Sequence, residues 1–281
     1  MDEMEFYEMK LGSVPWTDSQ MRDSIDEFAE VYSRRPMKEN VGGMASPHLF
    51  LIWFLLRQLK PKSIIESGVW FGLGTWFIEQ ACPNANIYCI DPVLERIRYR
   101  SSRAEYSTLD FARTNWSQLD REETVLFFDD HQNAYQRLIV ARWMGFRHLV
   151  FEDNYAEGTG DCYSIKKVLN DCGHQMPPRP LFSLHGLRTR VGKLLLHGRH
   201  SVANGDVVAN DADSTYVRKN VEIYHELPPV FSCDNTRFGI PWHHARFQTP
   251  APLLKLSSKP IHQDFLAAAA SYTWMCYVRL L

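Results

Sequence analysis

Two clusters of acidic and amide side chains follow apolar runs in the middle of the chain. Asp129 and Asp130 end the run ETVLFF, and Glu152, Asp153 and Asn154 end the run RHLVF. Asp and Asn favour turns, so both clusters are compatible with ordinary strand ends. Carboxylate and amide oxygens are also the ligands that hard divalent cations prefer. The clusters alone leave two interpretations open: a pair of turns, or a metal or cofactor site.

The elements around these clusters predict an α/β fold. Short apolar runs lie at residues 62–67, 85–90, 123–128 and 147–152, with helix-like stretches between them. Apolar runs that do not alternate are typical of parallel strands buried on both faces. We therefore predict a Rossmann-like, doubly wound, mostly parallel sheet, with residues 271–281 as an antiparallel edge strand. Such sheets bind ligands at the carboxyl ends of their strands, where both acidic clusters fall.

Four segments show helical patterns. Residues 17–34 carry apolar side chains every three or four positions, with Thr17 or Asp18 as the predicted cap. Residues 46–60 are almost continuously apolar, which predicts a buried helix that ends before a proline. Residues 134–145 predict a crossover helix that a glycine ends, and residues 214–227 predict a further helix.

A glycine-rich turn joins the first predicted strand to the helix after it. Glu66 precedes Gly68 by two residues, and Gly72 and Gly74 follow. Glycine here lets the backbone approach a ligand closely and lets the helix pack on the strand. The spacing differs from the G-x-G-x-x-G pattern of dinucleotide-binding folds, which disfavours NAD as the ligand. A purely structural turn is the alternative.

Asp91 supplies a second signal for a nucleoside. It ends the second predicted strand, 25 residues after Glu66. An acidic side chain in that place can accept hydrogen bonds from both hydroxyls of an adenosine ribose. The residue therefore indicates a nucleoside without specifying which one, and an Asp-Pro turn is the alternative.

These features together resemble the class I S-adenosylmethionine-dependent methyltransferases, and most of all the divalent-cation-dependent O-methyltransferases of the catechol and caffeoyl-CoA types. In that group an Asp ends the fourth strand, a Tyr follows six residues later, and an Asp-Asn pair ends the fifth strand. Asp129, Tyr135 and the pair Asp153-Asn154 match this pattern. The turn ESGVWFG and the acid of IDP match the group's donor-binding positions. The resemblance covers roughly residues 45–170.

The resemblance implies two cofactors, S-adenosylmethionine and Mg²⁺ or another divalent cation. The residues that it implies for donor binding are Glu66, Gly68, Trp70, Gly72, Asp91 and Asp129. The ligands that it implies for the cation are Asp129, Asp153 and Asn154, an oxygen-only set that suits Mg²⁺. The cation would hold a substrate hydroxyl and favour its oxyanion. Trp70 would contact the sulfonium through a cation–π interaction, with core packing as the alternative.

Three positions leave the ligand set and the base open. Glu152 resembles an acid that precedes the metal Asp in a cephalosporin-hydroxylase-like group of this fold, so Glu152, like Asp130, is a further candidate ligand. The catechol-type enzymes carry a basic Lys three residues after the metal Asp, but Gln132 stands there and cannot accept a proton. His131 is the predicted base instead, with an ordinary pKa near 6.5. The alternative for His131 is packing against the following helix.

Composition limits the classes of protein and partner. The chain has 281 residues with 45% hydrophobic and 23% charged residues, which is typical of a globular protein. The net charge of −2 argues against a general nucleic-acid binder. The longest apolar run, residues 49–56, is far shorter than the roughly 20 residues that span a bilayer. With an acidic N-terminus that lacks a secretory pattern, these features predict a cytoplasmic protein; a homo-oligomer is left open.

We expect one domain with four parts. Residues 1–60 form N-terminal helices that pack on the core, residues 61–176 form the donor-binding α/β core, residues 177–260 form an elaboration on the substrate side, and residues 261–281 complete the sheet. The elaboration contains a basic stretch that would either bind an anionic acceptor or form a solvated surface. Its cations are Arg188, Arg190, Lys193 and Arg199.

The favoured function is a metal-assisted O-methyltransferase that acts on a small hydroxylated metabolite or a sugar. The alternative is a non-catalytic or repurposed protein of the same fold, which binds a nucleoside or a metal without methyl transfer. Gln132 in place of the basic Lys favours this alternative.

Overall fold

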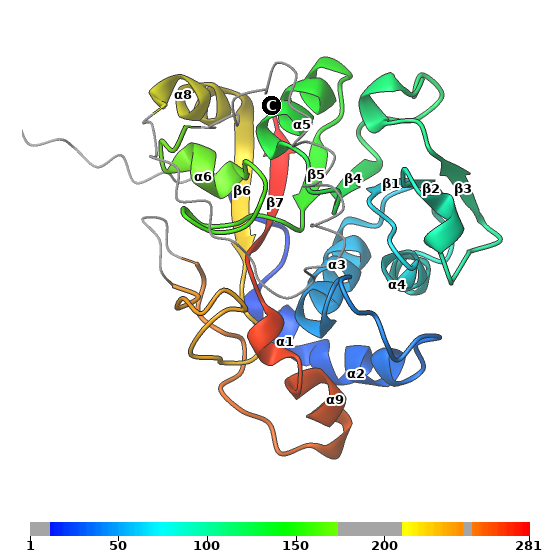
Figure 1. Ribbon diagram of the computed structural model, residues 1–281, viewed down its shortest axis with the longest axis vertical. Helices are drawn as coiled ribbons and strands as arrows, with labels where there is room; N and C mark the ends of the chain where they lie inside the picture. The colour runs from blue at the N-terminus through cyan, green and yellow to red at the C-terminus, as the bar shows by residue number, and fades with distance from the viewer. Residues whose placement is uncertain (1–11, 174–209, 244–248) are drawn as a thin grey trace, which may run out of the picture.

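A computed structural model describes residues 12–173, 210–243 and 249–281, and seven strands within them form one sheet (Figure 1). The strand order is β3-β2-β1-β4-β5-β7-β6. β1 to β5 pair in parallel, whereas β7 is antiparallel to both of its neighbours. The predicted Rossmann-like, mostly parallel sheet is therefore confirmed. The strands are β1 (Ser63–Ser67), β2 (Asn86–Ile90), β3 (Ala104–Ser107), β4 (Thr124–Phe128), β5 (His148–Phe151), β6 (Val221–Leu227) and β7 (Met275–Leu280).

The far side of the sheet differs from the sequence prediction. The antiparallel strand is β7, but it lies one strand in from the edge, and β6 is the edge strand. The predicted helix over residues 214–227 is a helix only as far as Asn220, because Val221 begins β6. Val221 and Ile223 turn into the core while Glu222 between them is partly exposed, and this two-residue period suits a strand. β3 escaped prediction because it is short and only partly buried.

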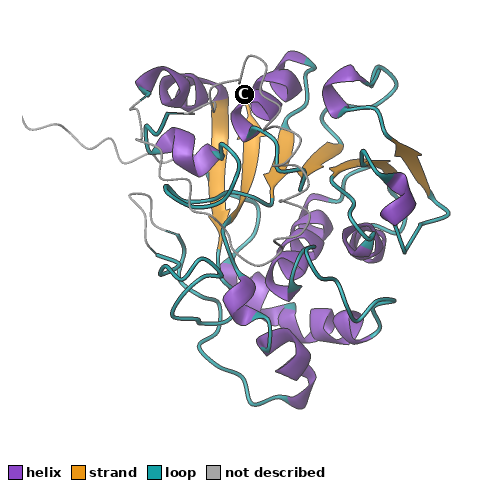
Figure 2. Ribbon diagram, in the orientation of Figure 1, coloured by secondary structure: helices purple, strands orange, loops and turns teal. Residues whose placement is uncertain are grey.

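Helices cover both faces of the sheet (Figure 2). On β4, Val125 and Phe127 join the hydrophobic core that contains α3 and α4, while Leu126 and Phe128 join the core that contains α5, α6 and α8. Burial on both faces explains the unbroken apolar runs of the parallel strands. The helices are α1 (Asp18–Asp23), α2 (Ile25–Ser33), α3 (Ser46–Leu59), α4 (Leu73–Ala81), α5 (Ala134–Trp143), α6 (Ile165–Leu169), α8 (Asp211–Asn220) and α9 (Gln263–Leu266).

The N-terminal helices follow the sequence prediction with one break. Thr17 caps α1 through a reciprocal capping box with Gln20, as expected. The single helix predicted over residues 17–34 is two helices that meet at Ser24. The Ser24 hydroxyl donates to the backbone oxygen of Gln20 at 2.8 Å, and such back-bonding bends helices. α3 is buried along most of its length and ends before Pro61, as expected.

Within the predicted elaboration 177–260, the described residues contribute α8 and β6 to the layers of the central fold. The basic stretch with Arg188, Arg190, Lys193 and Arg199 lies outside the described residues. None of the helices described is long and apolar enough to cross a membrane.

Candidate active site

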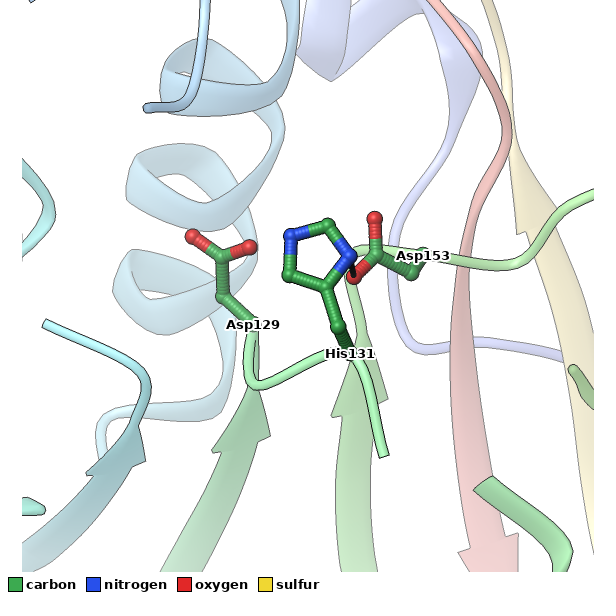
Figure 3. Close-up of side chains that lie close together, drawn as sticks. All are labelled: Asp129, His131 and Asp153. Atoms are coloured by element: carbon green, nitrogen blue, oxygen red, sulfur yellow. Dashed lines mark ion pairs between the residues drawn. The ribbon is translucent and has the colours of Figure 1, made fainter. Parts of the chain in front are cut away.

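Three predicted site residues meet at the carboxyl edge of β4 and β5. Asp129 follows β4, His131 lies two residues later, and Asp153 follows β5. Their ligating atoms all lie within 4.8 Å of one another, and the imidazole stands between the two carboxylates (Figure 3). Because the parallel pairing of β4 and β5 aligns Phe128 with Phe151, the residues after each strand are brought side by side.

Asp153 is buried without a full set of hydrogen bonds. Its Oδ1 accepts a hydrogen bond from the hydroxyl of Tyr155. Its Oδ2 is buried and, among the described residues, has no hydrogen-bond partner. The Nδ1 of His131 lies 3.3 Å from Oδ2, which is within ion-pair range although the geometry is not that of a hydrogen bond. A buried carboxylate oxygen of this kind is costly unless a ligand satisfies it.

The two carboxylates repel each other. Burial, followed by the negative charges of Glu152 and Asp153, raises the pKa of Asp129 well above its ordinary value. Burial and the charge of Glu152 likewise raise the pKa of Asp153. Crowded carboxylates therefore retain protons that a cation between them would displace.

Glu152 is adjacent to this cluster but already has a partner. Its Oε1 lies 2.5 Å from the Nδ1 of His48 in α3, and both side chains are buried. The backbone N–H of Thr273 donates to the Nε2 of His48 at 3.1 Å, so Nδ1 must carry the proton that Glu152 accepts. Burial disfavours the charge of Glu152, but His48 lowers its pKa below the ordinary value. One oxygen of Glu152 is thus already hydrogen-bonded to a side chain of α3.

Asp130, which lines a pocket with His131 and Asp153, already has partners of its own. Its Oδ2 accepts hydrogen bonds from the hydroxyl of Ser67 and from Arg137, both at 2.7 Å. Arg137 also binds Asp110 through two hydrogen bonds, at 2.9 and 2.7 Å. This partly buried network distinguishes the two adjacent aspartates: Asp129 belongs to the cluster, and Asp130 ties the end of β4 to α5.

Asn154, a predicted ligand, is not brought to the cluster. Its Oδ1 accepts from the backbone N–H of Lys166 at 2.9 Å, and its Nδ2 donates to the hydroxyl of Tyr224 at 3.0 Å. The amide therefore anchors the start of α6 and the sheet strand β6. The structure brings two members of the predicted set, Asp129 and Asp153, together with His131, while the amide of Asn154 has partners in α6 and β6.

His131, the predicted base, faces the cluster and does not pack against α5. Its backbone is in the left-handed region with φ of 52°, a strained conformation for a residue other than glycine. Its Nδ1 lies 3.0 Å from the Oδ1 of Asp161. This hydrogen bond, with the charges of Asp153 and Asp161, raises the pKa of His131 to about 9. The imidazole is thus mostly protonated at neutral pH, where a base with the ordinary pKa would be neutral.

The glycines of the turn are required by the chain itself. Gly68 has a φ of +96°, and a Cβ on it would lie 1.9 Å from the backbone oxygen of Asp129. Gly72 has a φ of +93°, and its Cβ would lie 2.1 Å from the backbone oxygen of Tyr99. Both positions therefore need glycine to pack the turn against neighbouring loops. Gly68 in particular places the turn against the acidic cluster.

Asp91 holds this turn in place. Its Oδ2 accepts from the backbone N–H groups of Val69 and Trp70, at 3.1 and 3.0 Å. Its Oδ1 accepts from the N–H of Val93 at 2.8 Å and from Arg96 at 3.4 Å. A carboxylate offers about four acceptor positions, and all four are engaged. Asp91, which was predicted to bind a ribose, therefore stabilises the conformation of the glycine-rich turn in this structure.

Glu66 is buried beneath the same turn. Its Oε2 accepts from the hydroxyl of Thr75 at 2.5 Å and from the thiol of Cys89 at 3.4 Å. Its Oε1 is buried and has no hydrogen-bond partner among the described residues. Burial raises the pKa of Glu66 to about 8. Like Asp153, it offers a buried oxygen that a polar ligand could satisfy.

One small pocket joins the turn to the acidic cluster. Four of the predicted donor-binding residues line it, together with residues before α3 and in α4. The four are Glu66, Gly68, Trp70 and Asp129. Asp91 and Gly72 do not line this pocket but shape the turn that does. A second pocket on the other side of the cluster includes His131 and Asp153.

Sequence patterns missed several residues of the site. His48 and Tyr155 bond directly to the acidic side chains after β5, Asp161 binds His131, and Arg237 binds Tyr155. Tyr155 and Asp161 lie close to the Asp-Asn pair in the chain, which is a usable signal. His48 and Arg237 are more than 80 residues from their partners, and no local pattern distinguishes them.

No protein-family profile matches the chain, and no curated protein sequence matches it. Among solved structures, it is similar to the O-methyltransferase from Bacillus cereus in complex with S-adenosylhomocysteine, with 10% identity, a TM-score of 0.41, and coverage of 95% of this chain and 93% of that one. It is also similar to the O-methyltransferase TomG from Streptomyces achromogenes, involved in tomaymycin synthesis, with 13% identity, a TM-score of 0.39, and coverage of 94% and 91%.

A third similar structure is the apo form of CmcI-N160, with 18% identity and a TM-score of 0.30. That match covers 37% of this chain and 51% of that one, or about half of its length. The Bacillus cereus and Streptomyces achromogenes structures are both described as O-methyltransferases. At these TM-scores the matches carry no argument about the chemistry of this chain, which rests on its own site.

Proposed function

We propose that this protein is an S-adenosylmethionine-dependent O-methyltransferase assisted by a divalent cation. The observation that carries the proposal is the shared pocket, in which Glu66 and Gly68 of the turn lie beside Asp129 of the acidic cluster. A donor at the turn and a cation at the cluster would then be neighbours. Such a pairing aligns an acceptor hydroxyl with the donor methyl, and alignment of reactants is a large part of catalysis.

The cluster suits a cation in its donor atoms. Asp129 and Asp153 supply oxygens, and the buried Oδ2 of Asp153 has no other hydrogen-bond partner among the described residues. His131 adds a ring nitrogen to the set. A mixed nitrogen and oxygen set suits Mn²⁺, Fe²⁺ or Zn²⁺ as well as Mg²⁺. We therefore propose a divalent cation and leave Mg²⁺ as one candidate.

The turn suits the donor. The free Oε1 of Glu66 would accept a hydrogen bond from the donor's amino group, whose positive charge would favour ionisation of this carboxyl. Trp70 lines the same pocket, where its ring could contact a sulfonium. The contact from Arg96 to Asp91, at 3.4 Å, is the longest of the four, so a ribose hydroxyl could replace it.

When bound, the cation would lower the pKa of an acceptor hydroxyl, and S-adenosylmethionine would supply the methyl group. The chain's own part is to hold both at one edge of the sheet and to fix the acidic side chains through Tyr155 and His48. If the two aspartates hold the cation without a nitrogen ligand, His131 is the candidate to accept the hydroxyl proton. Because its pKa is about 9, it serves only once neighbouring carboxylates are neutralised or the pH is alkaline.

The acceptor that we propose is a small hydroxylated metabolite or a sugar. The second candidate function is binding of a nucleoside or a metal without methyl transfer. Gln132 supports it, because the side chain donates to the backbone oxygen of Asp130 and cannot act as a base. The two candidates make the same prediction for binding and opposite predictions for turnover.

Paired binding and transfer measurements test the proposal. Calorimetry should detect S-adenosylhomocysteine, and electron paramagnetic resonance should detect one bound Mn²⁺. Asp153→Asn should weaken Mn²⁺ by more than about 100-fold, because even partners outside the coordination shell cost 10- to 100-fold. Asp130→Asn is the matched control and should change Mn²⁺ affinity little, since Asp130 is engaged by Ser67 and Arg137.

A screen of hydroxylated acceptors with labelled methyl donor then separates the two functions. Label transfer that depends on the divalent cation supports the methyltransferase. Binding of both ligands with no transfer to any acceptor supports the binding protein. If the unmutated protein binds neither ligand at millimolar concentration, both proposals are wrong.

A further inference from the structure

A tight turn between β6 and β7 carries an arginine to the acidic site. The backbone N–H of Thr236 donates to the oxygen of Ile240 at 2.8 Å, and the N–H of Gly239 donates to the oxygen of Thr236 at 2.9 Å. Thr236 is buried, whereas Arg237 at the tip of the turn is exposed. Phe238 packs edge-on against Tyr155, with ring centroids 5.3 Å apart. These contacts fix the turn beside the residues that follow β5.

Arg237 approaches the cluster through Tyr155. Its NH2 group donates to the Tyr155 hydroxyl at 2.8 Å, and that hydroxyl donates in turn to the Oδ1 of Asp153. Burial opposes the charge of Arg237, but Tyr155 and the carboxylates of Glu152 and Asp153 raise its pKa above the ordinary value. The guanidinium is therefore a fixed positive charge one side chain away from the proposed cation site.

Among the described residues, the guanidinium of Arg237 has N–H donors that no partner occupies. It carries five N–H donors in a planar fork, a shape that matches a carboxylate or a phosphate through two parallel hydrogen bonds. Across the described part of the chain, it donates to Tyr155 and lies within ion-pair distance of no carboxylate. The nearby carboxylates thus favour the charged form of Arg237 without forming hydrogen bonds to its guanidinium. A partly buried guanidinium on an exposed residue beside a reaction site is suited to an anionic ligand.

We propose that Arg237 binds an oxyanion of the acceptor, a carboxylate or a phosphate, and so selects hydroxylated acids or phosphate esters over neutral hydroxyl compounds. This inference rests on the proposed function, since it assigns the substrate class of the same site. Tyr155 positions the guanidinium, and Phe238 holds the turn in place. The proposal depends on described residues alone and not on the basic stretch near residue 190.

A purely compensating role is the competing explanation. Arg237 would then only offset the charges of Glu152 and Asp153. Both explanations predict that loss of Arg237 tightens Mn²⁺ binding, because a nearby positive charge is removed. Only the proposed role predicts a preference for anions, so anion preference is the readout that separates them.

The test measures binding of three small aromatic probes by ligand-observed NMR: benzoate, phenyl phosphate and neutral phenol. The protein is loaded with S-adenosylhomocysteine and Mg²⁺, and Mn²⁺ binding is measured on the same preparations. At least one anion should bind about 10-fold or more tightly than phenol, as expected for a charge-assisted pair. The preferred anion identifies the source of the oxyanion.

Arg237→Gln should bring the anion and phenol affinities together, and Arg237→Lys should restore part of the preference, because Lys keeps the charge but not the fork. Arg142→Gln, at an exposed arginine at the end of α5, is the matched control and should keep the full preference. The proposal is overturned if the unmutated protein does not prefer either anion, or if Arg237→Gln keeps the preference. If Mn²⁺ fails to bind while an anion preference persists, the cation proposal fails and Arg237 keeps its role.

Discussion

Two groups of buried charged side chains lie at the same level of the sheet, since Cys276 of β7 pairs with Phe151 on one side and with Glu226 on the other. In the first group, Lys166 binds both oxygens of Glu226, at 2.6 and 2.7 Å. Thr249 and Tyr224 also donate to Glu226. The second group is the acidic cluster. It has two adjacent carboxylates with raised pKa values, and the Oδ2 of one of them has no hydrogen bond.

The difference separates structure from function. A buried charge whose partners are complete holds elements together, and here it joins α6 to β6 through Lys166 and Glu226. A buried charge without partners costs stability and is retained only where a ligand completes it. Asn154 links the two groups, with its Oδ1 on the Lys166 backbone and its Nδ2 on Tyr224. We call the Lys166–Glu226 group balanced, because its charges are paired, and the acidic cluster unbalanced. The balanced group therefore supports the loop that carries the acidic cluster.

The largest effect that we expect is on the balanced group. Lys166→Met should lower the free energy of unfolding by about 3–5 kcal/mol, because it leaves the buried Glu226 without its cation. Urea unfolding followed by circular dichroism measures the change. Lys167→Met, at the next and less buried lysine, is the control and should cost much less. A cost below about 1 kcal/mol for Lys166→Met would contradict the assignment of this pair as the structural one.

Glu66 extends the comparison to a buried carboxyl with one free oxygen. Its pKa rises to about 8 on folding, so between the ordinary carboxyl value and pH 8 the folded state holds a proton that the unfolded state has lost. Through Glu66 alone, stability is greatest at low pH and falls by about 1.4 kcal/mol per pH unit across that window. Glu66→Gln should make the total slope shallower by this amount while keeping an acceptor for Thr75; the slopes that Asp129 and Asp153 contribute should persist.

The slope is measured as the free energy of unfolding at several pH values in the absence of donor. Glu105→Gln, at an exposed glutamate, should leave the slope unchanged. An identical slope in Glu66→Gln and the unmutated protein would mean that Glu66 is ionised in the fold. It would then belong with the balanced charges.

The smallest effect that we expect is a gain in stability, opposite in sign to the loss expected for Lys166→Met. Asp153→Asn should raise the stability of the metal-free protein by roughly 1 kcal/mol, because it removes a carboxyl whose ionisation the fold opposes and keeps an acceptor for Tyr155. Thermal unfolding in the presence of a chelator measures it. A loss of stability comparable to that of Lys166→Met would erase the distinction between the two groups.

Local pattern was enough for the central part of the fold. The strands β1, β2, β4 and β5 and the helix α3 follow from apolar runs with turn signals at their ends, because residues buried on both faces leave an unambiguous sequence. Where burial is one-sided or partial, the pattern fails. Residues 214–227 were predicted as one helix, and β3 was not predicted, because short edge strands carry few apolar residues.

For the site, the sequence by itself determined that Asp129 and Asp153 follow two different strands, with His131 two residues after the first of them. It also determined that Glu66 precedes a glycine-rich turn and that Asp91 ends the next strand. Only the tertiary structure decided what each carboxylate faces. Asp129 and Asp130 are neighbours in the chain, yet Asp130 pairs with Arg137 and accepts a hydrogen bond from Ser67, while Asp129 lies among like charges. Asn154 binds the start of α6, and Arg237 and His48 belong to segments that are distant in the sequence from the residues they contact. The physical reason is that the charges around a side chain come from all residues near it in space, and the spacing of residues along the chain does not specify which residues those are.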